Sequence, residues 1–191
     1  GAVTELTLEN LALNDVEVSQ LAVALRGQTQ LNRLVLSNNA FTDIALEQLA
    51  PTIFASSNLT VVEIGSNVLG DKGAHWLSQA LANKTNLIEL SCWNNHFHSA
   101  GLKSLVPVVA QNLNLSTLNL SSNGFNYDDF AALANAIKAH HNLKVINLYG
   151  MKLGIDGLNL FLPALTANKV TLREIRLSSC YLGADGLQLL V

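Results

Sequence analysis

A short leucine pattern that returns at a fixed step constrains the fold of this chain more than any other feature. In its clearest copy, residues 115–125, leucines stand at positions 1, 4 and 6, Asn123 at position 9 and Phe125 at position 11. Apolar residues two positions apart have the period of a strand with one buried face. A single strand of this kind cannot bury its leucines, so the pattern requires copies beside it.

The chain supplies seven copies in one register. Positions 1, 4, 6 and 11 are apolar in every copy, and the step is 28 residues five times and 29 once. The copies begin at Val3, Leu31, Leu59, Leu87, Leu115, Leu143 and Leu172. They predict one solenoid domain over residues 1–191. Because the first unit has no preceding cap and the seventh stops within its expected helix, we expect a fragment of a longer chain.

The second half of each unit is expected to be a helix. In the first unit, apolar residues recur with helical spacing at Val18, Leu21, Ala22 and Leu25. A short polar residue stands at position 13 or 14, as Asp15 and Asp43 do. We expect it to accept hydrogen bonds from the unpaired N–H groups of the helix that it precedes.

Three prolines add a second period to the helices. Pro51, Pro107 and Pro163 all occupy position 21, and only in the even-numbered units. Proline inside a helix frees the carbonyl four residues earlier, and those residues are polar, so the freed carbonyls are expected to face water. The pattern predicts kinked or shortened helices that alternate with regular ones.

Composition limits the classes of partner and the compartment. The formal net charge is −3 and there is no basic run, which disfavours nucleic acid. No apolar stretch approaches the ~18 residues of a membrane span, and we expect no signal peptide before the first strand. Cys92 and Cys180 lie three units apart, or ~14 Å across parallel strands, too far for a disulfide. Two buried thiols favour a reducing, cytoplasmic location.

The form LxxLxLxxN/C-x-L, followed by a helix and returning every 28 residues, resembles the ribonuclease-inhibitor-like class of leucine-rich repeats over essentially the whole chain. Position 9 carries the resemblance through Asn39, Asn67, Asn95 and Asn123, with Cys180 as the permitted variant. The resemblance implies a right-handed α/β horseshoe, with a concave parallel sheet, convex helices and asparagines that bond loop backbone. Leu11 and Met151 depart, so we expect a broken asparagine ladder in repeats one and six.

The family includes cytosolic nucleotide-binding immune receptors, activators of the Ran GTPase and bacterial effectors that act inside host cells. This chain looks most like the effector or receptor-repeat kind. Its low charge and many asparagines suggest a bacterial source, such as a Legionella virulence effector acting in the host cytoplasm. The resemblance also implies that positions 3 and 5 face the concave side and that positions 7, 8 and 10 line its rim.

Those positions supply the candidate protein interface. Its residues are Glu63, Glu89, Trp93, His96, Asn119, Asn147, Tyr149 and Arg176. Trp93 and Tyr149 share position 7 two strands apart, ~10 Å, and exposed aromatics are typical interface anchors. Alternatively, Trp93 folds over its own loop and covers the Asn95 turn. Acidic residues gather toward the amino end and basic ones toward the carboxyl end, which suits a partner of opposite polarity or is simply a solvated face.

Enzymatic chemistry finds little support in the residues. His96 is expected on the rim and His98 near a helix start, so the pair diverges and forms no metal site. His140 and His141 follow the fifth helix, where a cation suits the helix dipole. Cys92 faces the core without a nearby base, and the sequence contains no phosphate loop or nucleophile elbow. We expect no catalytic residue, cofactor or small-molecule substrate.

The sequence therefore predicts a recognition module whose partner is another protein. One alternative is a regulatory or autoinhibitory repeat segment of a multidomain immune-receptor-like protein. Another is a Ran-type GTPase-activating repeat protein, which would need a catalytic or switch-stabilising arginine or asparagine on the rim; none can be assigned.

Overall fold

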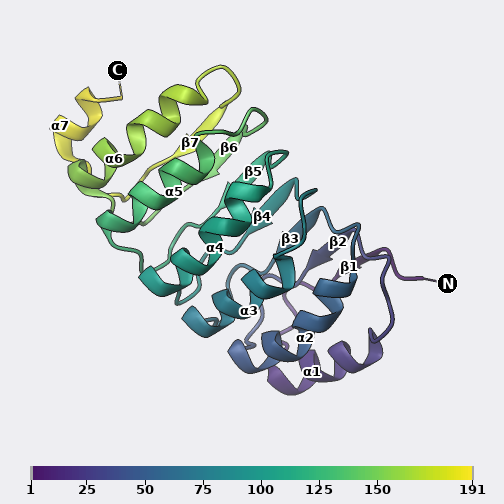
Figure 1. Ribbon diagram of the computed structural model, residues 1–191. Coiled ribbons are helices and arrows are strands. Elements are labelled where there is room, and N and C mark those ends of the chain that lie inside the picture. Colours follow the sequence, from purple (N-terminus) through teal and green to yellow (C-terminus); the bar gives the residue numbers. More distant parts are fainter. Residues whose placement is uncertain (1, 191) are drawn as a thin grey trace.

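The computed structural model describes residues 2–190, which form a curved stack of strand–helix units (Figure 1). The strands are β1 (Glu5–Thr7), β2 (Arg33–Val35), β3 (Val61–Glu63), β4 (Glu89–Ser91), β5 (Thr117–Asn119), β6 (Val145–Asn147) and β7 (Glu174–Arg176). The helices are α1 (Asp15–Ala24), α2 (Asp43–Ala55), α3 (Asp71–Leu81), α4 (Ser99–Gln111), α5 (Phe130–Ile137), α6 (Gly154–Ala167) and α7 (Gly183–Gln188), with a 3₁₀ turn, η1 (Tyr127–Asp129), before α5.

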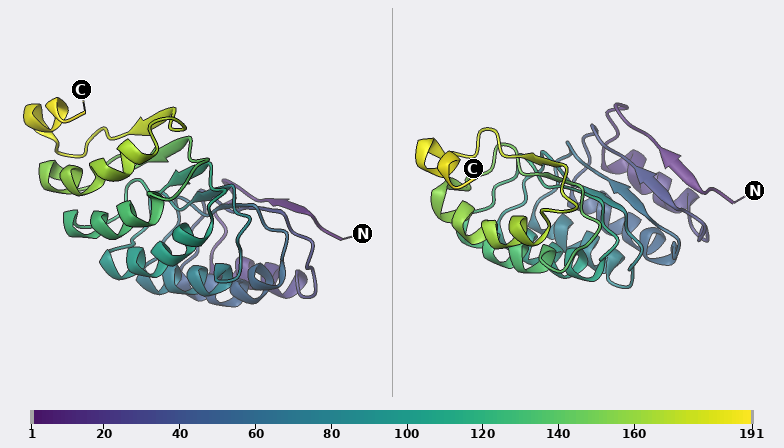
Figure 2. Two further views of the ribbon diagram at one scale, coloured as in Figure 1. Left: turned by 45° about the horizontal axis from the view of Figure 1, so that its top comes forward. Right: turned by 90° about the horizontal axis from the view of Figure 1, so that it is seen from above.

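The strands form one parallel sheet in the order β1 to β7, each paired in register with the next. The helices lie on the outer side of the curve and the sheet on the inner side (Figure 2). Leu118 pairs with Leu90 on one side and Ile146 on the other, and all three side chains are fully buried. The leucine positions therefore form one continuous core, which confirms the expected α/β leucine-rich solenoid.

The asparagine ladder at position 9 is confirmed. Asn95 donates from Nδ2 to the carbonyls of Ile64, Cys92 and Trp93, and its Oδ1 accepts from the backbone N–H of Leu69. Cys180 keeps two of these bonds, from its Sγ to the carbonyl oxygens of Leu148 at 2.9 Å and Ser178 at 3.7 Å. The ladder is broken in repeats one and six, as expected, because position 9 holds an apolar residue without an amide there. Leu11 is 54% exposed and Met151 is fully buried.

Both cysteines are free and buried, as their separation predicted. Burial raises the pKa of the Cys92 thiol to about 12, and burial also raises the pKa of Cys180.

The aspartates at position 13 begin the helices rather than precede them, which corrects the expected capping. Each carboxylate accepts a backbone N–H from the next repeat: Asp15 from Thr42 at 2.6 Å, Asp43 from Gly70 at 2.7 Å and Asp71 from His98 at 2.7 Å. Asn14 and Thr42 cap their own helices instead. A Cβ at Gly101 would lie 2.6 Å from the Asp71 Oδ1, so glycine leaves room for this contact. The aspartates thus join neighbouring repeats.

The prolines do mark alternate helices, but the expected shortening is wrong. The proline-containing α2, α4 and α6 have 13, 13 and 14 residues, whereas α1, α3 and α5 have 10, 11 and 8. Pro51 is exposed, and so is Glu47, whose carbonyl the proline leaves without a helical hydrogen bond. That carbonyl therefore belongs to a residue on the solvent side, as expected. Because only solvent-facing backbone is affected, these helices continue past the proline.

His140 is buried, not a solvated cation at a helix end. It is 1% exposed, and neither ring nitrogen has a hydrogen-bond partner within residues 2–190. Burial lowers the pKa of the ring, opposed by nearby backbone carbonyls that include those of Ile137 and Val109. Asn112 and Asn168 hold the same repeat position, and the Asn168 amide donates to the Ile137 carbonyl.

We expect the stability of the chain to fall between pH 7 and pH 5, in part through His140. The unfolded chain binds a proton near the ordinary pKa of about 6.5, whereas the folded chain keeps the ring neutral to lower pH, so acid favours unfolding. His140→Asn should reduce this slope, for which one proton contributes at most about 1.4 kcal/mol per pH unit. Urea unfolding at several pH values measures it. His141→Asn, at an exposed neighbour, is the control and should leave the slope unchanged; equal slopes in all three proteins would contradict the expectation.

Candidate functional site

The inner wall of the sheet presents side chains from positions 3 and 5 of each repeat. Among the candidate residues, Glu63, Glu89 and Asn119 are half-buried, Asn147 is 8% exposed, and Arg176 is exposed. No other element of the described chain packs over this side (Figure 2). The wall is therefore a curved, largely polar surface in contact with solvent.

Ion pairs reduce the predicted separation of charge along the wall. Arg33 on β2 pairs with Glu63 on β3 at 2.5 Å, and Arg176 on β7 pairs with Glu174 of the same strand. Burial raises the pKa of Glu89, as does the charge of Glu63, while the charge of Arg33 lowers it. Acidic and basic residues are thus interspersed at both ends, and a simple polarity match to a partner has less support than the sequence suggested.

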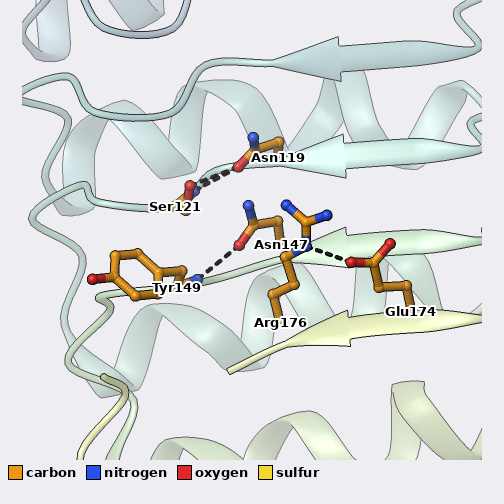
Figure 3. A network of polar contacts seen from close by, with 6 residues as sticks. All are labelled: Asn119, Ser121, Asn147, Tyr149, Glu174 and Arg176. Carbon is orange, nitrogen blue, oxygen red and sulfur yellow. Dashed lines mark hydrogen bonds and ion pairs between the residues drawn. The ribbon is translucent and has the colours of Figure 1, made fainter. Parts of the chain in front are cut away.

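Asn119 and Asn147 shape the rim beside the fifth and sixth strands. Each side-chain oxygen accepts the backbone N–H two residues on, from Ser121 at 3.2 Å and from Tyr149 at 3.0 Å. Figure 3 shows both amides directed toward the turn that follows their strand, with Arg176 extending toward β6. These local bonds fix where the chain leaves the sheet, and so where the Tyr149 ring projects.

Trp93 lies over the preceding repeat rather than over its own loop. A Cβ at Gly65, the matching position of that repeat, would fall 2.1 Å from the indole Nε1. The ring is half-buried, so one face contacts β3's end while the rest stays in solvent. Neither sequence interpretation anticipated this packing, because it depends on glycine 28 residues earlier. Tyr149 is 47% exposed and keeps its expected place on the rim.

His96 lies on the rim, whereas His98 immediately precedes α4. Both histidines are exposed, and the His98 ring also lies against Gly124, where a Cβ would approach its Cδ2 to 2.7 Å. Within residues 2–190, no group of three or more His, Cys, Asp or Glu side chains is arranged to hold a metal ion. Across the same residues, none of the helices combines the length and apolar character needed to cross a bilayer.

Two features of the surface were missed by the sequence reasoning. One is a groove on the rim between repeats five and seven, whose walls include Tyr127 and Tyr181. The other is a shallow apolar groove between α2 and α3 on the convex side, with Phe54 and Trp76 in its lining. Both form between neighbouring repeats, so the periodic pattern within one repeat gives no signal for them. Trp76 also packs against the core.

Comparisons with known proteins agree with this architecture. The family profile described as "Leucine Rich repeat" matches residues 55–75, 111–134 and 168–191. No significant match was found among curated proteins.

Among solved structures, the chain is similar to "Leiomodin-1 Actin-Binding Site 2 (ABS2)", with TM-score 0.52 and 18% identity over 71% of this chain and 79% of that one. It is also similar to an internalin from Listeria monocytogenes, with TM-score 0.51 and 21% identity over 82% of this chain. It spans only 36% of that internalin chain. At these identities the likeness concerns the fold. Together with the seven-stranded parallel sheet and its convex helices, the matches show that this chain has the fold of a leucine-rich-repeat solenoid.

Proposed function

We propose that this solenoid is a recognition module that binds a partner protein through its concave wall and strand-to-helix rim. The observation that carries the proposal is the open inner wall, whose half-buried polar side chains lie beside the half-buried ring of Trp93 and the exposed ring of Tyr149. A rigid polar surface with a few aromatic anchors has the composition of a protein interface. The backbone bonds of Asn147 and the packing of Trp93 on Gly65 hold both anchors in place before a partner arrives.

The buried thiols support binding over nucleophilic catalysis. With its pKa near 12, Cys92 stays protonated at neutral pH and fully buried, so it supplies no thiolate.

The proposal extends to the subclass of the repeats and to the kind of protein that carries them. The 28-residue step with a helix in each repeat supports the ribonuclease-inhibitor-like subclass. We propose, on the sequence resemblance, that the module belongs to a bacterial effector acting on a host protein in the cytoplasm.

Substituting both rim aromatics should weaken partner binding at least about tenfold, because truncation of aromatic anchors removes most of the energy at such interfaces. The variant is Trp93→Ala with Tyr149→Ala. Recovery of each captured protein, and then its dissociation constant, would be compared with the wild type. Circular dichroism should show an unchanged fold, since neither ring belongs to the leucine core.

The convex face offers a matched control. Phe54→Ala with Trp76→Ala also removes one tryptophan and one further aromatic ring, from the groove between α2 and α3. This variant should bind like the wild type. Retained binding by the rim variant, with loss in the convex variant, would move the interface to the helices.

A further inference from the structure

The rim groove between repeats five and seven is built to hold its shape. It has a volume of about 430 Å³ and is lined by Tyr127, Lys152, Leu153, Gly154, Asp156 and Tyr181. The backbone N–H of Gly154 donates to the Cys180 carbonyl at 2.9 Å, which joins the sixth loop to the seventh. A Cβ at Gly157 would lie 3.3 Å from the Cβ of Tyr127, so Tyr127 packs closely on the start of α6.

Two tyrosine rings stand at this groove without being part of the core. Tyr127 is 49% exposed and Tyr181 is 77% exposed. They come from different repeats, one from η1 and one from the loop before α7. A Cβ at Gly154 would meet nothing within 4 Å, so the space above this glycine is open. Aromatic rings beside the open space above Gly154 offer their π faces to a planar or cationic group of a ligand.

The charge of the groove selects between those occupants. Asp156 lies in the first turn of α6 and lines the groove, and Asp128 is adjacent to Tyr127. A hydrogen bond to the Asp128 side chain raises the pKa of Tyr127, and the charges of Asp128 and Asp156 raise it further. Two carboxylates, those of Asp128 and Asp156, therefore lie near the Tyr127 phenol, against one ammonium in the lining, that of Lys152. Apolar or proline-rich segments would not use these carboxylates, whereas a cation would.

We propose that this groove binds an arginine side chain of a partner protein, with the guanidinium against the tyrosine rings and paired with Asp156. Arginine fits better than lysine, because its planar head both stacks on aromatic faces and bonds a carboxylate through two N–H groups. The site deepens the proposed function and rests on it, since the groove lies on the same strand-to-helix rim as Trp93 and Tyr149. It assigns the carboxyl-terminal part of that rim a defined chemical preference.

Nuclear magnetic resonance titration with N-acetyl-arginine amide tests the site without any partner. We expect saturable shifts at the amides of Tyr127, residues 153–156 and Tyr181. The neutral isostere N-acetyl-citrulline amide should bind at least about threefold more weakly, because the charge-dependent contribution is lost. Asp156→Asn and Tyr181→Ala should each weaken arginine binding by a similar factor, and Lys152→Gln should strengthen it.

Glu47→Gln is the matched control. It removes the same charge from an exposed site on α2, four repeats away, and should leave arginine binding unchanged. Absent or non-saturating shifts at the groove, equal binding of citrulline, or equal weakening by Glu47→Gln would each overturn the proposal. The double variant Trp93→Ala with Tyr149→Ala should still bind the arginine amide. Failure of the groove is thus distinguishable from failure of the concave interface, because the partner assay and this titration are independent.

Discussion

Phe125→Ala should lower the free energy of unfolding by about 4 kcal/mol, because it opens a cavity in the continuous core. Phe125 is fully buried at position 11 of the fifth repeat, where a large apolar side chain recurs in every unit. Its loss removes packing both within its own repeat and against neighbours. Urea unfolding followed by circular dichroism measures the change.

The same substitution at Phe54 serves as its control. That ring is 52% exposed on α2 and lies under the Lys84 ammonium, 5.6 Å from the ring centroid. Since less apolar area is removed from water there, Phe54→Ala should cost about 1 kcal/mol or less. Equal losses for the two variants would mean that position 11 is not the packed spine of the solenoid.

Asn95→Ala should destabilise the chain by about 3 kcal/mol, although it removes only a small polar group. The Asn95 side chain is 5% exposed and satisfies four backbone groups from two consecutive repeats. Alanine would leave the Leu69 N–H buried without a partner, which carries a desolvation cost. The carbonyls of Ile64, Cys92 and Trp93 would each lose one hydrogen bond and keep another, from Asn67, Asn123 and Ser66. Thermal and urea unfolding of the variant would measure the loss.

Leu11→Ala tests the same repeat position where the ladder is broken. Because Leu11 is exposed and makes no side-chain hydrogen bond, this change should stay within about 0.5 kcal/mol of the wild type. An Asn95→Ala cost below about 1 kcal/mol would show that the ladder is dispensable.

The sequence predicted the architecture because each repeat states the same pattern independently. The leucines at positions 4 and 6, such as Leu118 and Leu120, define both the strand and its buried face. The 28-residue step then sets the register, and the observed pairing of Leu118 with Ile146 follows from it. Which residues face the inner wall could be predicted for the same reason.

Features that depend on contact between repeats were not predictable in this way. Asp71 accepts the His98 N–H from a residue 27 positions away, and Trp93 packs on a glycine 28 positions earlier. His140 looked like a solvated residue after a helix because the pattern does not reveal what the next repeat covers. The prolines were misjudged because their effect on helix length depends on which side of the helix faces water.

The same distinction, between features of a single repeat and contacts between repeats, applies to the candidate site. The expected positions of Glu89, Asn119 and Tyr149 on the wall and rim followed from the family resemblance, applied in the register of the repeats. The ion pair between Arg33 and Glu63, and the groove between Tyr127 and Tyr181, arise from side chains that meet across repeats. The identity of a partner lies in such details, which explains why the sequence indicates a binding surface more readily than its ligand.

Hydrogen–deuterium exchange of the chain, free and bound to a captured partner, tests the central claim most directly. The open inner wall predicts slower exchange in peptides covering β4 to β6 and the loops after them, with α2 and α3 unchanged on the outside. Slower exchange confined to the convex helices, with the strands and rim unaffected, would contradict it.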